Sequence, residues 1–239
     1  MATYSQGNQL PPAKDEELKI QMNLLICFAL KEEAAPFRKI AAGIGLHPGH
    51  HVSILLTGIG RQNTEKSVRK FLATHSPKLV LTCGFTGGLN PDLKLGEVVF
   101  ELAGPAANNQ KLVTNLDAAG AKPVKFFCAD RIATTVAEKK KLRAESGADA
   151  VEMESAAIYA VCRERGIPCA TVRVISDTAT EDLPLDFNML SKPDKSLNYG
   201  KLFLAITESP GKIGALLQLR KKTKFAAEQL ANTLKKIIW

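Results

Sequence analysis

Three carboxylates of this sequence, Glu33, Glu154 and Asp177, each stand just after an apolar run. A carboxylate can take a proton from water, hold hydroxyl groups or donate a proton to a leaving group. Each of the three could also simply begin or cap a helix. Their types therefore indicate acid–base chemistry only if the fold brings them together.

A glycine-rich segment from Gly84 to Gly88 follows another apolar run. Glycines let the backbone approach a ligand closely and present N–H groups to an anion. The segment is not a Walker loop, because no Gly-Lys-Ser/Thr follows, and its spacing is not GxGxxG. We predict a turn here, and a plain connection between a strand and a helix is the alternative to a ligand-binding role.

Short apolar runs alternate with amphipathic stretches along the chain. Strands are predicted at 24–30, 51–57, 79–83, 148–153 and 169–175, and helices at 31–40, 62–74 and 155–165. Strands without polar alternation are buried on both faces, and strands separated by helices are usually parallel. The pattern predicts a three-layer α/β/α sandwich with a mostly parallel, twisted central sheet. Ligands bind beyond the carboxyl ends of such strands, where the three carboxylates stand.

The composition is that of a soluble globular protein, with 45% hydrophobic and 23% charged residues among 239. No repeat, low-complexity tract or linker divides the chain. We predict a flexible leader over residues 1–20 and a single catalytic domain over residues 21–239, ending in a basic helical extension from about residue 212. The five cysteines show no CxxC spacing, and no signal peptide or membrane-spanning run is present, so a cytoplasmic location is expected.

The excess positive charge lies at the end of the chain, where residues 201–239 contain eight Lys or Arg and two Glu. A nucleic-acid-binding protein would spread basic charge over its fold and interleave aromatics, so no nucleic-acid partner is expected. Apolar residues recur among the lysines at Leu216, Leu217, Leu219, Phe225, Leu230, Leu234 and Ile238. A helix packed on its own domain or on a partner subunit is favoured over peripheral membrane contact.

Three histidines, His47, His50 and His51, stand close together but have no fourth ligand at a suitable spacing. A surface loop is therefore favoured over a metal site, and neither a metal nor a cofactor is expected.

Five stretches together resemble the nucleoside phosphorylase/nucleosidase superfamily, particularly the methylthioadenosine/S-adenosylhomocysteine nucleosidases. They are Ala29 to Glu33, Thr57 to Gly60, Gly84 to Leu89, Val151 to Ser155 and Val174 to Asp177, which occur in the family's order and spacing. The resemblance covers about residues 22–190. The most specific part is the pair VEMES and ISD, about 20 residues apart.

The resemblance implies a role for each carboxylate in cleaving the bond between a ribose and a purine. Asp177 matches the acid that protonates, or hydrogen-bonds, N7 of the leaving purine. Glu154 matches the carboxylate that holds the ribose hydroxyls. Glu33 matches the carboxylate that positions and deprotonates the attacking water.

The resemblance also implies which residues contact the substrate. Met153 would pack under the sugar, the backbone of Ile132 and Ala133 would read the base edge, and Phe187 would cover the base. Arg173 and Ser176 would support Asp177. The remaining expected contacts are Ile59, Phe85, Thr86, Gly87 and Glu152.

The same comparison leaves hydrolysis and phosphorolysis both open and favours hydrolysis. Related phosphorylases bind phosphate with an arginine and a serine, where this chain has Thr82 and Phe85. A phenylalanine cannot donate to phosphate, and Glu33 would repel the dianion. Arg38 or Arg61 could replace the missing arginine.

We therefore expect a purine nucleoside N-ribosyl hydrolase that releases adenine or a related purine from a 5′-modified nucleoside. The alternative is a phosphate-dependent nucleoside phosphorylase. This alternative includes one that acts on an adenosyl lipid such as adenosylhopane, which is the substrate implied where the C-terminal tail resembles the hopanoid-associated phosphorylase-like branch. The family usually completes its pocket with a neighbouring subunit, so a homo-oligomer is expected.

Overall fold

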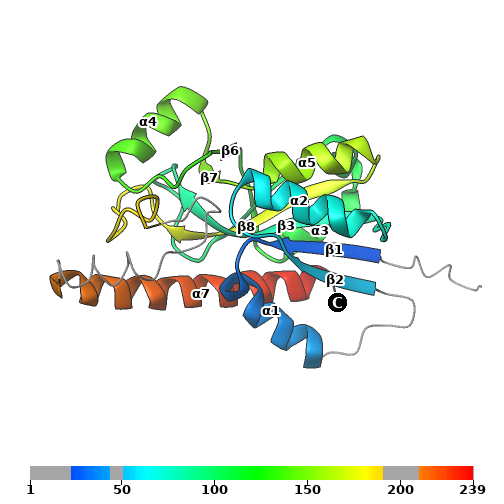
Figure 1. The fold of residues 1–239 in the computed structure, drawn as a ribbon, viewed down its shortest axis with the longest axis horizontal. Helices are drawn as coiled ribbons and strands as arrows, with labels where there is room; N and C mark the ends of the chain where they lie inside the picture. Colours follow the sequence, from blue (N-terminus) through cyan, green and yellow to red (C-terminus); the bar gives the residue numbers. More distant parts are fainter. Residues whose placement is uncertain (1–22, 44–50, 191–209, 239) are drawn as a thin grey trace, which may run out of the picture.

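A mixed eight-stranded sheet with helices on both faces is formed by the residues that the computed structural model describes, 23–43, 51–190 and 210–238 (Figure 1). The strands are β1 (Asn23–Phe28), β2 (His51–Leu56), β3 (Leu79–Gly88), β4 (Val98–Ala103), β5 (Lys122–Pro123), β6 (Phe126–Cys128), β7 (Ala150–Glu152) and β8 (Cys169–Asp177). The helices are α1 (Lys31–Gly43), α2 (Arg61–Leu72), α3 (Gln110–Ala118), α4 (Val136–Ser146), α5 (Ser155–Glu164) and α7 (Ile213–Ile238), with 3-10 turns η1 (Gly104–Asn108) and η2 (Pro210–Lys212).

The strand order is β2-β1-β3-β8-β4-β5, with β7 paired to the end of β3 and β6 paired to β7. The pairs β1–β2, β1–β3, β3–β8, β4–β5 and β6–β7 are parallel, whereas β4–β8 and β3–β7 are antiparallel. The predicted three-layer sandwich with a mostly parallel sheet is confirmed.

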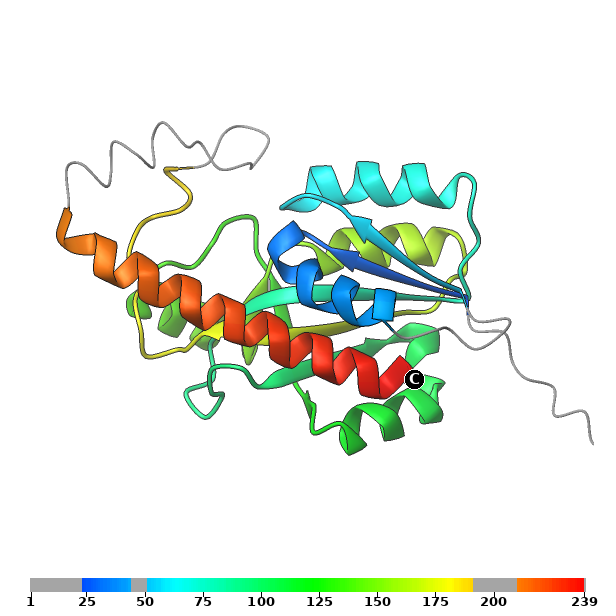
Figure 2. The ribbon, with the colours of Figure 1, turned by 90° about the horizontal axis from the view of Figure 1, so that it is seen from below.

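Each face of the sheet has its own apolar core, because successive side chains of a strand point to opposite faces. Ile26 of β1 packs with Leu230 of α7 on one face. Cys27, the next residue, packs with Val68 of α2 and Val161 of α5 on the other. Figure 2 shows α7 lying across the strands on the first face, beside α1. Burial on both faces explains why β1 contains no polar alternation.

The glycine-rich segment is a strand and not the turn that the sequence predicted. β3 continues through Gly88 and pairs with β8, where Gly84 faces Arg173 and Phe85 faces Val174. Gly84 has a φ of 147°, and a Cβ at this position would lie 2.6 Å from Oε1 of Glu33. A larger residue would displace that carboxylate, so the glycine is required by close approach within the strand.

None of the elements between residues 98 and 146 was predicted, and among them α4 matters most for the site. β5 and β6 contain only two and three residues, too few for a periodic signal. α4 has a capping box in which the Thr135 and Glu138 side chains bond each other's backbone N–H, and it ends at Gly147 in the left-handed conformation. These local signals fix the position of α4 although its sequence has a weak apolar stripe.

The C-terminal helix α7 joins the core along its second half, where the buried residues are Ala226, Ala227, Leu230, Ala231, Thr233, Leu234, Ile237 and Ile238. In its first half, Ile213, Leu217 and Phe225 are largely exposed. None of the helices in the described ranges is long and apolar enough to traverse a bilayer. The leader expected at 1–20 lies outside the described residues.

Candidate active site

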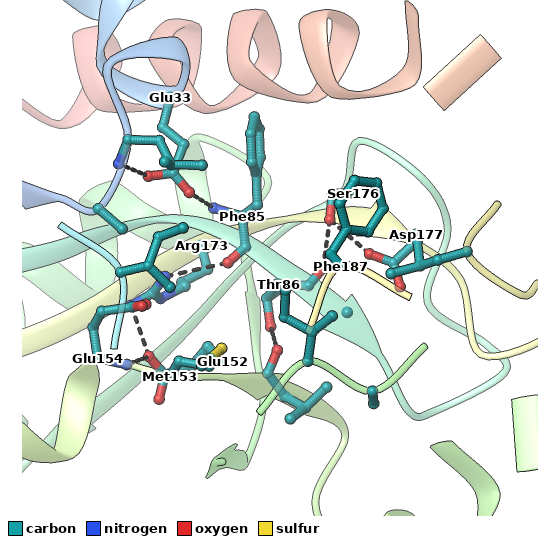
Figure 3. Close-up of a pocket in the computed structure, with 18 of the residues that line it drawn as sticks. Glu33, Phe85, Thr86, Glu152, Met153, Glu154, Arg173, Ser176, Asp177 and Phe187 are labelled. Carbon is teal, nitrogen blue, oxygen red and sulfur yellow. Dashed lines mark hydrogen bonds and ion pairs between the residues drawn. The ribbon is translucent and has the colours of Figure 1, made fainter. Parts of the chain in front are cut away.

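A cavity of about 230 Å³ lies where the carboxyl ends of β1, β3 and β8 meet β7 and α1. Figure 3 shows Glu33 and Glu154 on one side of this cavity and Asp177 and Phe187 on the other. All fourteen site residues expected from the sequence line it: Glu33, Ile59, Phe85, Thr86, Gly87, Ile132, Ala133, Glu152, Met153, Glu154, Arg173, Ser176, Asp177 and Phe187. The fold thus brings the three carboxylates together around one space.

Glu33 occupies the first turn of α1 with only 3% of its surface exposed. Its carboxylate accepts hydrogen bonds from the backbone N–H of Leu30 and of Phe85, both at 2.8 Å. Burial raises the pKa of Glu33 to about 7, although the positive charge of Arg173 opposes the shift. A carboxyl group with this pKa can both hold and release a proton near neutral pH.

Arg173 of β8 is a fully buried cation, and it contacts two of the carboxylates that line the cavity. Its Nη2 lies 2.7 Å from Oε2 of Glu152 and 3.1 Å from Oε2 of Glu154. The expectation that Arg173 supports Asp177 is wrong. The two positions are four residue steps apart, which is about 13 Å along an extended strand. Arg173 instead offsets the negative charge on the opposite side of the cavity.

Glu152 and Glu154 are adjacent in the structure but have different surroundings. Glu152 accepts hydrogen bonds from the backbone N–H of Glu154 and Ser155 and from the Ser155 hydroxyl. Its carboxylate thus provides acceptors for N–H groups at the N-terminal end of α5. Burial would raise the pKa of Glu152, but Arg173 and Ser155 outweigh it and lower the pKa. Burial raises the pKa of Glu154, which accepts a hydrogen bond from the backbone N–H of Gly60.

Asp177 ends β8 and is held by two donors. The hydroxyl of Ser176 donates to Oδ1 at 2.8 Å, as expected for a supporting residue. Nζ of Lys139 forms an ion pair with Oδ2 at 2.6 Å. Lys139 was not predicted from the sequence. It is one of three consecutive lysines in α4, and periodicity does not distinguish among them.

Another part of the cavity wall is formed by the segment around Ile132 and by Phe187. Both the backbone N–H and the backbone carbonyl of Ile132 are bonded by the side-chain amide of Asn188, at 2.9 and 3.0 Å. The N–H of Ile132 is therefore not free to contact a ligand. Asn188 was not predicted as a site residue. Its side chain joins the segment that contains Phe187 to the backbone of Ile132.

No group of three or more His, Cys, Asp or Glu within the described ranges is arranged to hold a metal ion. Of the clustered histidines, His47 and His50 lie outside those ranges, and the exposed His51 begins β2.

A family model described as Phosphorylase superfamily matches residues 14–100 and 110–208 of the sequence. The chain belongs to the phosphorylase superfamily. Among curated relatives of this superfamily member is a 5′-methylthioadenosine/S-adenosylhomocysteine nucleosidase of a Marinomonas species, 29% identical over 60% of this chain and 75% of the relative. Another is a DeoD-type purine nucleoside phosphorylase of Streptococcus pyogenes, 24% identical over 57% of this chain and 67% of the relative.

The fold of this superfamily member is similar to that of solved nucleosidases. The crystal structure of the Helicobacter pylori 5′-methylthioadenosine/S-adenosylhomocysteine nucleosidase superposes with a TM-score of 0.67 and 18% identity. The superposition covers 92% of this chain and 99% of the other.

Proposed function

We propose that this superfamily member is a purine nucleoside N-ribosyl hydrolase that releases adenine or a related purine from a 5′-modified nucleoside. The observation that carries the proposal is the position of Glu33, whose buried carboxylate faces the same cavity as Asp177 and Glu154. The nucleosidases among the relatives support it.

The proposed reaction assigns one task to each carboxylate. Asp177 donates a proton to N7 as the bond between C1′ and N9 breaks, which neutralises the leaving purine. Glu154 holds the ribose hydroxyls and favours the positive charge that develops on the sugar. Glu33 takes a proton from the water that attacks C1′. Placing that water correctly supplies up to roughly 7–11 kcal/mol of the barrier.

Hydrolysis is favoured over phosphorolysis because Glu33 fills the place that an anion would need. Its carboxylate already accepts the backbone N–H groups of Leu30 and Phe85. Thr82, at one of the positions where related phosphorylases bind phosphate, is engaged within the protein, because its hydroxyl accepts a hydrogen bond from Arg173. Arg38 and Arg61, which could have replaced a phosphate-binding arginine, are not among the described residues that line the cavity.

The proposal is tested by measuring purine release from methylthioadenosine, adenosylhomocysteine, adenosine and inosine, with and without inorganic phosphate. We expect release from the 5′-modified nucleosides without phosphate, with free ribose sugar as the other product. Release that strictly requires phosphate and yields a ribose 1-phosphate would establish the phosphorylase alternative instead.

The role of Glu33 as a base predicts a pH dependence that can be measured separately from proton donation by Asp177. In 4-nitrophenyl β-riboside the phenolate leaves without a proton, so Asp177 is not needed for its departure. A base acts only when ionised, and the pKa of Glu33 is raised to about 7. We therefore expect hydrolysis of this riboside to fall as the pH drops below about 7 and to level off above it.

Glu33→Gln should lower the rate for this riboside by roughly 10²–10⁴-fold and abolish the rise with pH. Glu32→Gln is the matched control, because the Glu32 side chain is 60% exposed and pairs only loosely with Lys31. A Glu33→Gln enzyme with the wild-type pH profile would refute the assignment of the base.

We also propose a cytoplasmic location and a homo-oligomer. The five cysteines are unpaired, and four of them are buried, which suits a reducing compartment. Met189 follows closely on Phe187 and is 68% exposed, so a second subunit could cover the pocket at this edge. Light scattering of the purified protein tests the oligomer.

A further inference from the structure

Lys139 is the most deeply buried lysine among the described residues, with none of its surface exposed. Its Nζ donates to the backbone carbonyls of Thr178 at 2.7 Å and of Glu181 at 3.0 Å, and it pairs with Asp177 at 2.6 Å. Three acceptors surround the ammonium group and match its three protons. The adjacent Lys140 and Lys141 are exposed. Burying an ammonium ion is costly, so its partners must compensate.

The segment after β8 is built around this ammonium group. Glu181 accepts the backbone N–H of Thr178 with its carboxylate and also pairs with Lys222 of α7. Asp182 accepts the backbone N–H of Val136 at the start of α4. α4, the segment 177–182 and α7 are thus tied together, and Lys139 is pointed at one oxygen of Asp177.

We propose that Lys139 is a positioning residue that holds the Asp177 carboxyl group in the orientation from which it donates a proton to the departing purine. This inference rests on the proposed function. When the C1′–N9 bond breaks, its electron pair goes to the purine, the O–H bond of Asp177 breaks and an N7–H bond forms. After the transfer, Oδ1 of Asp177 still accepts from the Ser176 hydroxyl and Oδ2 from Lys139, so the carboxylate keeps its place in the cavity. Lys139 keeps its own protons throughout.

Two other cations near the cavity, Arg173 and Arg131, are paired with other carboxylates. Arg173 is engaged by Glu152 and Glu154 on the ribose side. Arg131 pairs with Glu138, and its side chain is 60% exposed to solvent. Lys139 is the cation in direct contact with Asp177.

The test compares two substrates of the full-length enzyme. For a purine nucleoside, Lys139→Met should lower kcat by at least about tenfold, a share of the roughly 10²–10⁴-fold that a general acid supplies. For 4-nitrophenyl β-riboside, whose leaving group needs no proton, kcat should change by less than about twofold, because the acid contributes nothing. Lys139→Arg keeps the charge and should recover most of the purine activity. Lys140→Met is the matched control and should behave as wild type.

Equal slowing of both substrates by Lys139→Met would overturn the inference, because a purely structural lysine would disturb the whole site. Lys139→Leu, which also removes the donor, repeats the comparison should the methionine variant fold poorly. In the Lys139→Met/Asp177→Asn double variant, the purine rate should equal that of Asp177→Asn alone. A double variant in which the effects of the two single substitutions on the purine rate multiply would also overturn the inference. Failure of the proposed function can be distinguished from failure of this inference, because the wild type would then release no purine from any nucleoside without phosphate.

Discussion

Asp177→Asn should slow purine release by about 10²–10⁴-fold, the contribution of a general acid. The asparagine amide has the same shape, but it cannot transfer a proton to N7 as the purine leaves. KM should change little, because the amide can still hydrogen-bond the base. Initial rates of adenine release from methylthioadenosine at saturating concentration measure the effect.

Asp130→Asn is the control for this variant, because the Asp130 side chain is 91% exposed. The Asp177 variant also leaves Lys139 buried beside a neutral group, so its melting temperature should be recorded with the rates. If the variant is folded and turns over within about threefold of wild type, the acid is a different residue, because losing a general acid costs far more.

Arg173→Met should cost the protein roughly 3–5 kcal/mol of unfolding free energy. Arg173 is 1% exposed, and its charge compensates Glu152 and Glu154 in the same interior. Without it, these carboxylates and that of Glu33 would share a low-dielectric space and lose the cation that the described part of the chain places beside them. Their protonation would offset part of the loss, so the destabilisation should grow as the pH rises.

Urea unfolding of wild type and variant between about pH 6 and pH 8 measures this difference. The matched control is Arg69→Met, in which an exposed arginine loses its pairing with Glu164 and Glu65. We expect that variant to unfold close to wild type, because solvent screens exposed pairs. An Arg173 variant as stable as the Arg69 variant would show that the buried charges do not need this guanidinium.

Much of the site could be predicted from sequence because its residues follow apolar strands directly. Glu33 and Asp177 follow the parallel strands β1 and β8, which present their carboxyl ends at one edge of the sheet. Glu154 follows β7, which pairs antiparallel with the end of β3 at the same edge. The resemblance added their roles and the surrounding contacts, and all of these residues line one cavity.

The segment from Gly84 to Gly88 was read as a turn because glycine ordinarily ends strands. Pairing with β8 on one side and β7 at its end overrides that preference and keeps it extended. Local propensity is too weak to resist a full ladder of hydrogen bonds to neighbouring strands.

The sequence by itself determined the layered fold and the identity of the three carboxylates, since both follow from local apolar runs and the residues next to them. Only the tertiary structure decided which cation serves which carboxylate. Arg173 and Asp177 share a strand but lie too far apart along it, whereas Lys139 reaches Asp177 from a helix 38 positions earlier in the chain. Charge pairing inside a protein depends on distances between side chains that sequence spacing does not encode.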